Sequence, residues 1–356
     1  MKAFLKDRLN LLTYGSVAAL LFFFVVFSAT HGGFGAGLSS GSTRFYVETM
    51  GRSLAYIAVV AIDFAAIFLA FLAIVSNLKN FIGLFKGRRY VPTMLGGTSL
   101  KATCRNGAKT LWRAIVVVAP AIVLMIVMSL VLDGMNVVDK ARLLDVRILG
   151  LEQSFLGGYG FTVFGSVHYP TWLARFIVWS FESMSGLLLV AAFIVAYVRE
   201  EILRELVASF CFCMILMVPA WFLFPALSPQ DRFVDNIYHL PETAMIAAAV
   251  SQYHPVAPIA DFLTSVRAEK SGLADLPTST LPSAHAAWAV LVGYYLFRAR
   301  RWLGWIALPI LIASTAGTVI LAQHYVFDVP VGILIAAFAI FLVSTVAKKE
   351  TENVIG

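Results

Sequence analysis

The stretch that decides the fold is residues 281–332 of this 356-residue chain. It opens with Leu-Pro-Ser-Ala-His (281–285), runs through two apolar segments separated by a basic turn, and closes with Gln-His-Tyr-Val-Phe-Asp-Val-Pro-Val-Gly (323–332). His285 and His324 stand at the ends of hydrophobic segments, and Asp328 follows His324 by four residues. Ionisable groups at such positions are costly and tend to mark function. The stretch therefore predicts a reactive site at a membrane boundary.

The composition is that of a membrane protein. Hydrophobic residues make up 60% of the chain, charged residues 13%, and the mean hydropathy is +0.84. Soluble domains are nearer half apolar and a quarter charged. The net charge of +7 is spread over residues that flank apolar segments, without the aromatic interleaving of a nucleic-acid-reading surface. We therefore expect a membrane partner and no nucleic acid.

Apolar runs of about 17 to 25 residues can cross the hydrocarbon core as helices. The chain holds eight such runs, and they predict an all-α polytopic membrane protein with about eight transmembrane helices. The predicted spans are 10–30, 54–76, 112–132, 173–197, 203–224, 284–299, 302–322 and 325–347.

Basic residues near the ends of the spans predict the orientation. One side of the predicted membrane holds eighteen lysines and arginines, including those of the 77–111 loop, and the other side holds nine. Because cytoplasmic loops carry the excess of lysine and arginine, both termini are expected in the cytoplasm. The ends that carry residues 225–232, His285 and His324 then face the opposite, non-cytoplasmic compartment.

Two loops on that side are long enough to be functional. Residues 133–172 contain an apolar, glycine-bearing stretch at 148–165, and residues 225–283 are predicted to include a short helix whose body is 243–253. Loops longer than about 15 residues are usually functional or disordered. The apolar content of these two favours caps that pack over a membrane site.

The residue types fit phosphoryl transfer through a covalent intermediate. Such a reaction needs a nucleophile, a group that orients it, a proton donor for the leaving oxygen, and donors for the phosphate oxygens. His324 can attack through one ring nitrogen while Asp328 accepts the N–H of the other. His285 can protonate the leaving alkoxide and later deprotonate the acceptor. We place the start of the last helix close to His324, because Pro330 is tolerated in a first turn but not in a helix interior.

Three further residues are candidates for substrate binding. Ser283 is a good N-cap for the helix that carries His285, and the free amides of that first turn would face an anion. Arg232, in the segment that follows the fifth span, is the best candidate for a bidentate phosphate clamp. Tyr325, next to the proposed nucleophile, is expected to line the site.

These motifs carry a resemblance. Pro-Ser-x-His, followed 39 residues after its histidine by His-Tyr-x-x-Asp-Val-x-x-Gly, resembles the type 2 phosphatidic acid phosphatase superfamily. Within it the chain looks most like the inositol phosphorylceramide synthase and sphingomyelin synthase branch. The phosphatase branch carries Ser-Arg seven and six residues before the second histidine, where this chain has Gly317 and Thr318. The resemblance implies His324 as nucleophile, Asp328 as its partner and His285 as general acid and base, with no metal ion or other cofactor.

The resemblance also implies a division of the chain. Residues 110–347 would form the family's six-helix catalytic membrane core. Residues 1–109 would be an N-terminal extension of two helices and a basic cytoplasmic loop, and residues 348–356 a cytoplasmic tail.

Three functions fit these expectations. The first is a lipid phosphotransferase that moves a phosphorylated head group from a phospholipid donor to a lipid hydroxyl, with phosphoinositol as the head group that the resemblance suggests. The second is a phosphatase that passes the phosphate of phosphatidate or a polyprenyl phosphate to water. The third is a non-enzymatic lipid transporter, for which discontinuous helices and inverted repeats are typical.

Overall fold

A computed structural model of the chain describes residues 8–30, 116–124, 127, 142–237, 239, 243–270 and 279–355. Within these ranges the regular secondary structure is helical, and one isolated bridge joins Ala226 to Ser279. The helices are α2 (Arg8–Thr30), α6 (Asp145–Leu156), α7 (Gly160–Gly165), α8 (Thr171–Glu182), α9 (Met184–Val198), α10 (Glu200–Leu223), the π-helical turn η2 (Gln230–Val234), α11 (Ala244–Ser251), α12 (Ala257–Lys270), α13 (Ala284–Ala299), α14 (Arg301–Ile320) and α15 (Asp328–Ile355).

Several of these helices can cross a membrane. Three are long and apolar enough by themselves, at Glu201–Leu223, Arg301–Ile320 and Asp328–Lys349, and α8 with α9 would make a fourth. The apolar part of α2, Arg8–Phe23, is shorter. The predicted span 54–76 and the basic loop 77–111 lie outside the described residues, and of 112–132 only 116–124 and 127 are described. The chain is thus an integral membrane protein whose described part has three or four candidate spans.

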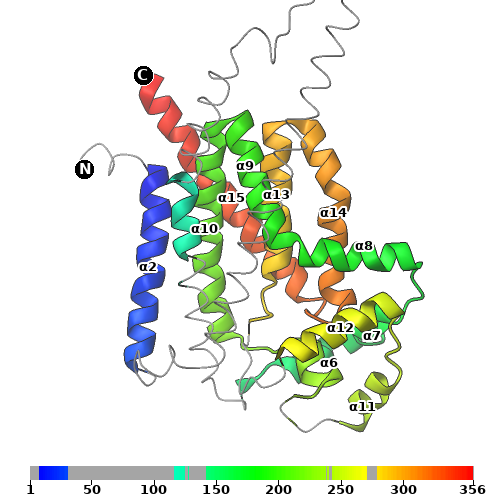
Figure 1. Ribbon diagram of the computed structural model, residues 1–356. Coiled ribbons are helices and arrows are strands. Elements are labelled where there is room, and N and C mark those ends of the chain that lie inside the picture. Colours follow the sequence, from blue (N-terminus) through cyan, green and yellow to red (C-terminus); the bar gives the residue numbers. More distant parts are fainter. Residues whose placement is uncertain are drawn as a thin grey trace, which may run out of the picture.

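The predicted fourth span, 173–197, is not one straight helix. It is divided into α8 and α9, which meet at Ser183 with a bend of 66°. Sharp kinks concentrate at glycine and serine pairs, and the bend falls beside Ser185 and Gly186. As a result α8 runs across the bundle while α9 runs along it (Figure 1).

Helix α13 is the centre of the bundle. It packs against α9, α10, α14 and α15, and buried residues occur all around it, from Ala286 to Ala299. A helix that is apolar on every side is stable only when neighbours cover it. Two polar contacts fix the position of α13 along α10. The hydroxyl groups of Tyr295 and Ser209 lie 2.6 Å apart, and Arg298 forms an ion pair with Glu205.

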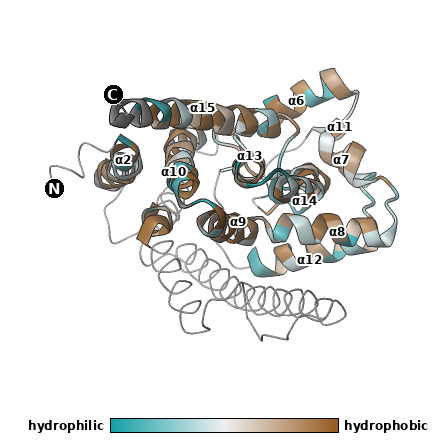
Figure 2. Cartoon of the chain, turned by 90° about the horizontal axis from the view of Figure 1, so that it is seen from above, coloured by the Kyte–Doolittle hydropathy of each residue, from teal (hydrophilic) through white to brown (hydrophobic). Residues whose placement is uncertain are grey.

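The remaining helices form a cap over one end of this bundle. Helices α6, α7, α11 and α12 gather around the ends of α13 and α14 at the bottom of Figure 1, and α8 crosses above them. The start of α2 and the end of α15 lie at the opposite end. Seen from above, the bundle helices are hydrophobic over most of their surface, and the cap lies beside α13 and α14 (Figure 2). The predicted loop helix is α11, which Thr243 caps by accepting a hydrogen bond from the Ile246 amide.

The first turn of α15 lies against the N-terminus of α13. A Cβ on Gly332 would sit 2.2 Å from the carbonyl oxygen of Ser283, closer than real Cβ contacts come. The amide of Ser283 also donates to the carbonyl of Asp328 at 3.0 Å. The glycine that ends the quoted motif is therefore required for the close approach of two backbones.

We expect Gly332→Ala to push α15 away from α13 and to lower the free energy of unfolding by about 1–3 kcal/mol, the usual cost of overpacking. The matched control is Gly150→Ala in α6, where an added Cβ meets nothing within 4 Å. This control should gain a few tenths to 1 kcal/mol because alanine favours helix. Unfolding midpoints in one detergent measure both, and an unchanged midpoint for Gly332→Ala would contradict the close approach.

Candidate active site

The structure brings His285, His324 and Asp328 together at the capped end of the bundle. His285 is the second residue of α13, His324 lies in the turn between α14 and α15, and Asp328 is the first residue of α15. The imidazole centroids of the two histidines are 6.1 Å apart and their planes meet at 61°. The two rings therefore lie edge to face within one site.

The Nδ1 atom of His324 faces two acceptors. It lies 2.9 Å from the carbonyl oxygen of Thr280 and 3.3 Å from Oδ2 of Asp328. A carbonyl and a carboxylate can only accept, so Nδ1 must carry the proton and donate it. In the neutral ring the lone pair is then on Nε2, which is the nitrogen left to act as a nucleophile. The contact with Asp328 matches the predicted pairing. The contact with Thr280 comes from the predicted capping loop 225–283, although the sequence did not indicate which carbonyl would face His324.

His285 lies between aromatic rings. The ring of Phe181, from α8, stacks on it at a centroid distance of 4.3 Å and an angle of 8°, and Trp288 lies 5.6 Å away. Within the described part of the chain its ring nitrogens make no hydrogen bond to protein. The ring is thus held in place by stacking rather than by hydrogen bonds to the described residues, and its role as general acid and base stays a prediction.

Helix α15 begins four residues later than His324, at Asp328. The pairing of His324 with Asp328 therefore spans a turn rather than one helix face. Oδ2 of Asp328 also accepts from the Tyr325 amide at 2.9 Å, which closes this turn. Pro330 is the third residue of this helix. Proline is tolerated there because the backbone nitrogens of the first turn donate no hydrogen bond within the helix. Ser283 is the N-cap of α13, as predicted, and its hydroxyl accepts from the Ala286 amide at 3.3 Å.

Arg232 lies in η2, which is joined to the histidine turn. The Gln230 amide donates to the carbonyl of Ala322 at 2.8 Å, and the side chains of Gln230 and Gln323 are hydrogen-bonded. Arg232 is only 4% exposed, and its guanidinium lies 4.7 Å from the ring centre of Phe233. The structure places it beside the site, and its role as a phosphate clamp stays a prediction.

Sequence reasoning missed two buried carboxyl groups of α6 that hold the same turn. Oδ1 of Asp145 accepts from the hydroxyl of Tyr325 and from the amide of Leu227, both at 2.8 Å. The Oε1 atom of Glu152 accepts from the Val326 amide at 2.5 Å, and Oε2 accepts from the Gly160 amide at 2.8 Å. The hydroxyl of Tyr325 is thus directed at Asp145, and a role of this side chain in substrate binding remains a prediction.

Burial dominates the ionisation of both carboxyl groups. It raises the pKa of Asp145 from 3.8 to about 6, against the opposing effect of its hydrogen bonds from Tyr325 and Leu227. It raises the pKa of Glu152 from 4.5 to about 7, and the nearby charge of Asp328 adds a smaller increase. The cause is that a charged carboxylate loses its hydration in an apolar environment.

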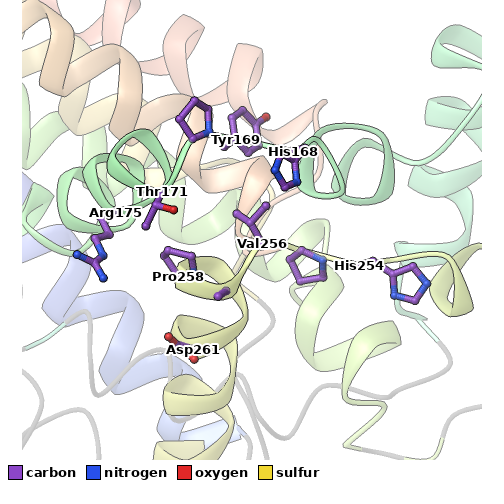
Figure 3. Close-up of a pocket in the computed structure, with 11 residues that line it drawn as sticks. His168, Tyr169, Thr171, Arg175, His254, Val256, Pro258 and Asp261 are labelled. Atoms are coloured by element: carbon purple, nitrogen blue, oxygen red, sulfur yellow. The ribbon is translucent and has the colours of Figure 1, made fainter.

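A separate pocket opens at the other end of α8. Its cavity volume is about 540 Å³. Figure 3 shows its lining, which includes His168, Tyr169, Arg175, His254 and Asp261. The pocket begins near Thr171, ten residues along α8 from Phe181, which corresponds to about 15 Å of helix. The pocket is therefore distinct from the histidine pair.

Among the described residues, no group of three or more histidine, cysteine, aspartate or glutamate side chains is arranged to hold a metal ion. The expectation of a metal-independent reaction remains a prediction.

A comparison with known protein families shows the class of protein to which this chain belongs. Residues 146–342, more than half of the chain, match the PAP2 superfamily, and the match includes both histidines, Asp328 and the whole of α6 after its first residue. The chain belongs to the PAP2 superfamily. It is accordingly an integral membrane enzyme of the phosphatase or phosphotransferase type that acts on lipids. No curated protein matches the chain. No solved structure matches it.

The raised pKa values predict a stability that falls as the pH rises. A carboxyl with a higher pKa in the folded state binds more protons when folded, so stability is greatest below its ordinary pKa. The loss begins near pH 4 and is complete above about 6 for Asp145 and about 7 for Glu152. Each shift corresponds to roughly 3 kcal/mol.

We expect the unfolding midpoint of the wild type to decrease from pH 4 to pH 7 and then to level off. The double variant Asp145→Asn with Glu152→Gln should show a flatter profile over this range, and Asp261→Asn, an exposed carboxyl of α12, should follow the wild type. Thermal unfolding in detergent at several pH values measures this. Parallel profiles for the wild type and the double variant would contradict the raised pKa values of Asp145 and Glu152.

Proposed function

We propose that this chain is a lipid phosphotransferase that moves a phosphorylated head group from a phospholipid to a lipid hydroxyl through a phosphohistidine on His324. The observation that carries the proposal is the arrangement around His324, whose Nδ1 faces two acceptors while the ring of His285 lies beside it at a centroid distance of 6.1 Å. Phosphoinositol as the head group and a ceramide-like alcohol as the acceptor rest on the sequence resemblance.

The first half of the reaction forms the phosphoenzyme. Nε2 of His324 attacks phosphorus, and the bond from phosphorus to the lipid alkoxide breaks. His285 gives its proton to the leaving oxygen, so that a neutral lipid alcohol departs. The positive charge that develops on the ring of His324 is stabilised by the carboxylate of Asp328, as in other histidine–carboxylate pairs.

The second half returns the enzyme to its starting state. His285 takes the proton from the acceptor hydroxyl, the hydroxyl oxygen attacks phosphorus, and the bond from phosphorus to Nε2 breaks. The product is a new phosphodiester, and both histidines recover their initial protonation. With water as the acceptor, the same steps release the phosphorylated head group or inorganic phosphate.

The charges around the site support a phosphodiester donor. Around η2, Lys270 pairs with Asp231 and Arg267 with Asp235, so the proposed clamp contributes one positive charge, that of Arg232. A phosphomonoester carries a charge of about −1.5 to −2 at neutral pH, whereas a phosphodiester carries about −1. Next to Asp328 and the acids of α6, the second negative charge would be repelled. This balance favours head-group transfer over hydrolysis of phosphatidate. The phosphatase is retained as the alternative because it would use the same histidines and Asp328.

The orientation supports access from the non-cytoplasmic leaflet. The excess of basic residues predicts that both termini are cytoplasmic, and α13, whose first turn carries His285, begins at the end of the bundle opposite the start of α2 and the end of α15 (Figure 1). We therefore propose that the site faces the non-cytoplasmic side.

We expect His324→Ala to abolish the acid-labile phosphate that a radiolabelled phospholipid leaves on the protein, since Nε2 is the attacking atom. His285→Ala should lower turnover by about 10²- to 10⁴-fold, the usual contribution of a positioned acid and base. His254→Ala, an exposed histidine of the separate pocket, should be as active as the wild type. Full turnover in both His285→Ala and His324→Ala would refute the mechanism.

The acceptor distinguishes transfer from hydrolysis. Purified protein is given head-group-labelled phosphatidylinositol with and without ceramide in mixed micelles. Transfer predicts that label moves to a new lipid at least about tenfold faster than it appears in water. If the label reaches water at the same rate with or without ceramide, and phosphatidate is hydrolysed faster than the diester, then the phosphatase alternative is correct.

A further inference from the structure

Helix α6 presents two acids on one face. Asp145 and Glu152 are seven residues apart, which is two helical turns, so both side chains lie on the same side of the helix. Ile148 and Leu149 lie between them, and all four residues are buried. The opposite face is exposed, with Leu151 and Phe155 at 50% and 74%. A stripe that begins and ends with a fully buried carboxyl is unusual, because a buried charge is costly unless it is hydrogen-bonded.

Both acids bind the chain directly after the proposed nucleophile. Asp145 accepts the hydroxyl of Tyr325, and Glu152 accepts the amide of Val326. These residues are the first and second after His324. The second bond of each carboxyl reaches a different segment: Leu227 for Asp145 and Gly160 for Glu152. The turn of His324 is therefore fastened at two successive residues to a helix 170 to 180 positions earlier in the chain.

The Nδ1 contacts with Thr280 and Asp328 orient the imidazole itself, and the backbone of the turn has further supports. The amides of Gln323 and His324 donate to the carbonyl of Thr318 at 3.0 and 2.8 Å, which anchors the turn to the end of α14. The Tyr325 amide donates to Asp328, which anchors it to α15. Both anchors belong to the helices that the turn connects. Two elements outside those helices also hold the turn: η2 through Gln230, and α6, whose two acids bind residues 325 and 326 directly after the imidazole.

We propose that Asp145 and Glu152 are positioning residues that form a two-point clamp on residues 325 and 326 and thereby hold Nε2 of His324 in line for attack on phosphorus. This proposal rests on the proposed function, since it assigns a purpose to the clamp only if His324 is the nucleophile. The clamp acts through hydrogen bonds to the turn and makes no contact with the reacting atoms. Its effect is on the rate of the chemical step, because a misplacement of about 1 Å can cost 10²-fold in rate.

Two variants loosen the clamp with little change in volume. Tyr325→Phe removes the hydroxyl that Asp145 accepts and keeps the buried ring. Glu152→Gln replaces one acceptor oxygen by an NH₂ group, so that an amide N–H must face the N–H of either Val326 or Gly160. The matched control is Ser154→Ala on the exposed side of α6, where the hydroxyl bonds only to the Leu151 carbonyl within the same helix.

The experiment uses the full-length protein in detergent, with head-group-labelled phosphatidylinositol as the probe. It measures kcat, KM and the single-turnover rate of phosphoenzyme formation at least 20 °C below each unfolding midpoint. A clamp predicts that kcat and the phosphorylation rate fall about 10- to 100-fold in Tyr325→Phe and in Glu152→Gln, with KM within about twofold of the wild type. Ser154→Ala should equal the wild type. If Glu152→Gln does not remain folded at the assay temperature, Tyr325→Phe carries the test alone.

The outcomes separate this inference from the proposed function. A purely structural role predicts lower midpoints but a kcat per folded molecule within about twofold of the wild type, which would overturn the clamp. A raised KM with unchanged kcat would also overturn it, because the side chains would then bind substrate. Activity in His324→Ala would overturn the proposed function itself. An inactive His324→Ala together with fully active Tyr325→Phe and Glu152→Gln would leave the function standing and remove the clamp.

Discussion

The proton on Nδ1 of His324 is the constraint on which the rest of the site depends. Two acceptors face that nitrogen, the Thr280 carbonyl at 2.9 Å and the Asp328 carboxylate at 3.3 Å. They come from the segment before α13 and from the first residue of α15, so satisfying one nitrogen requires both helices to start at the same place. The Trp221 indole donates to the Pro282 carbonyl at 2.8 Å, and the hydroxyl of Thr280 donates to the Ala226 carbonyl at 3.0 Å. The end of α10 is thereby tied to the same point.

The sequence predicted the parts of the site whose chemistry is carried by rare side chains. In an apolar chain, His285, His324 and Asp328 are conspicuous, and the count of spans indicated that they share one membrane boundary. The Thr280 carbonyl could not be found this way, because every residue has a carbonyl and only the folded turn selects one. Asp145 and Glu152 did leave a signal, two acids seven residues apart around Ile148 and Leu149. Only Glu152 lies in the apolar stretch 148–165, and the partners of the two acids, Tyr325 and Val326, lie too far along the chain for spacing to link them.

The fold was predictable to the extent that hydropathy determines it. The average over 173–197 is that of a membrane span, and it conceals the bend at Ser183, because serine and glycine hardly lower the average of a strongly apolar window. Similarly, α13 is only 16 residues long, yet burial on all sides places it at the centre. Length and apolarity indicate which segments avoid water. They do not indicate which of these segments is surrounded by the others.

The bend at Ser183 shows why a broken helix suits this site. A straight continuation of α9 would carry Phe181 along the bundle, away from the start of α13. With the bend of 66°, α8 turns across the bundle, and Phe181 reaches His285 while contacting Phe262 of α12 with its edge. Backbone that leaves a regular helix at membrane depth is tolerated where protein covers it, and here α12 and α14 pack against α8. One aromatic side chain then joins the cap to the proposed acid. The stacking that covers His285 is therefore also a contact that holds the cap against the bundle.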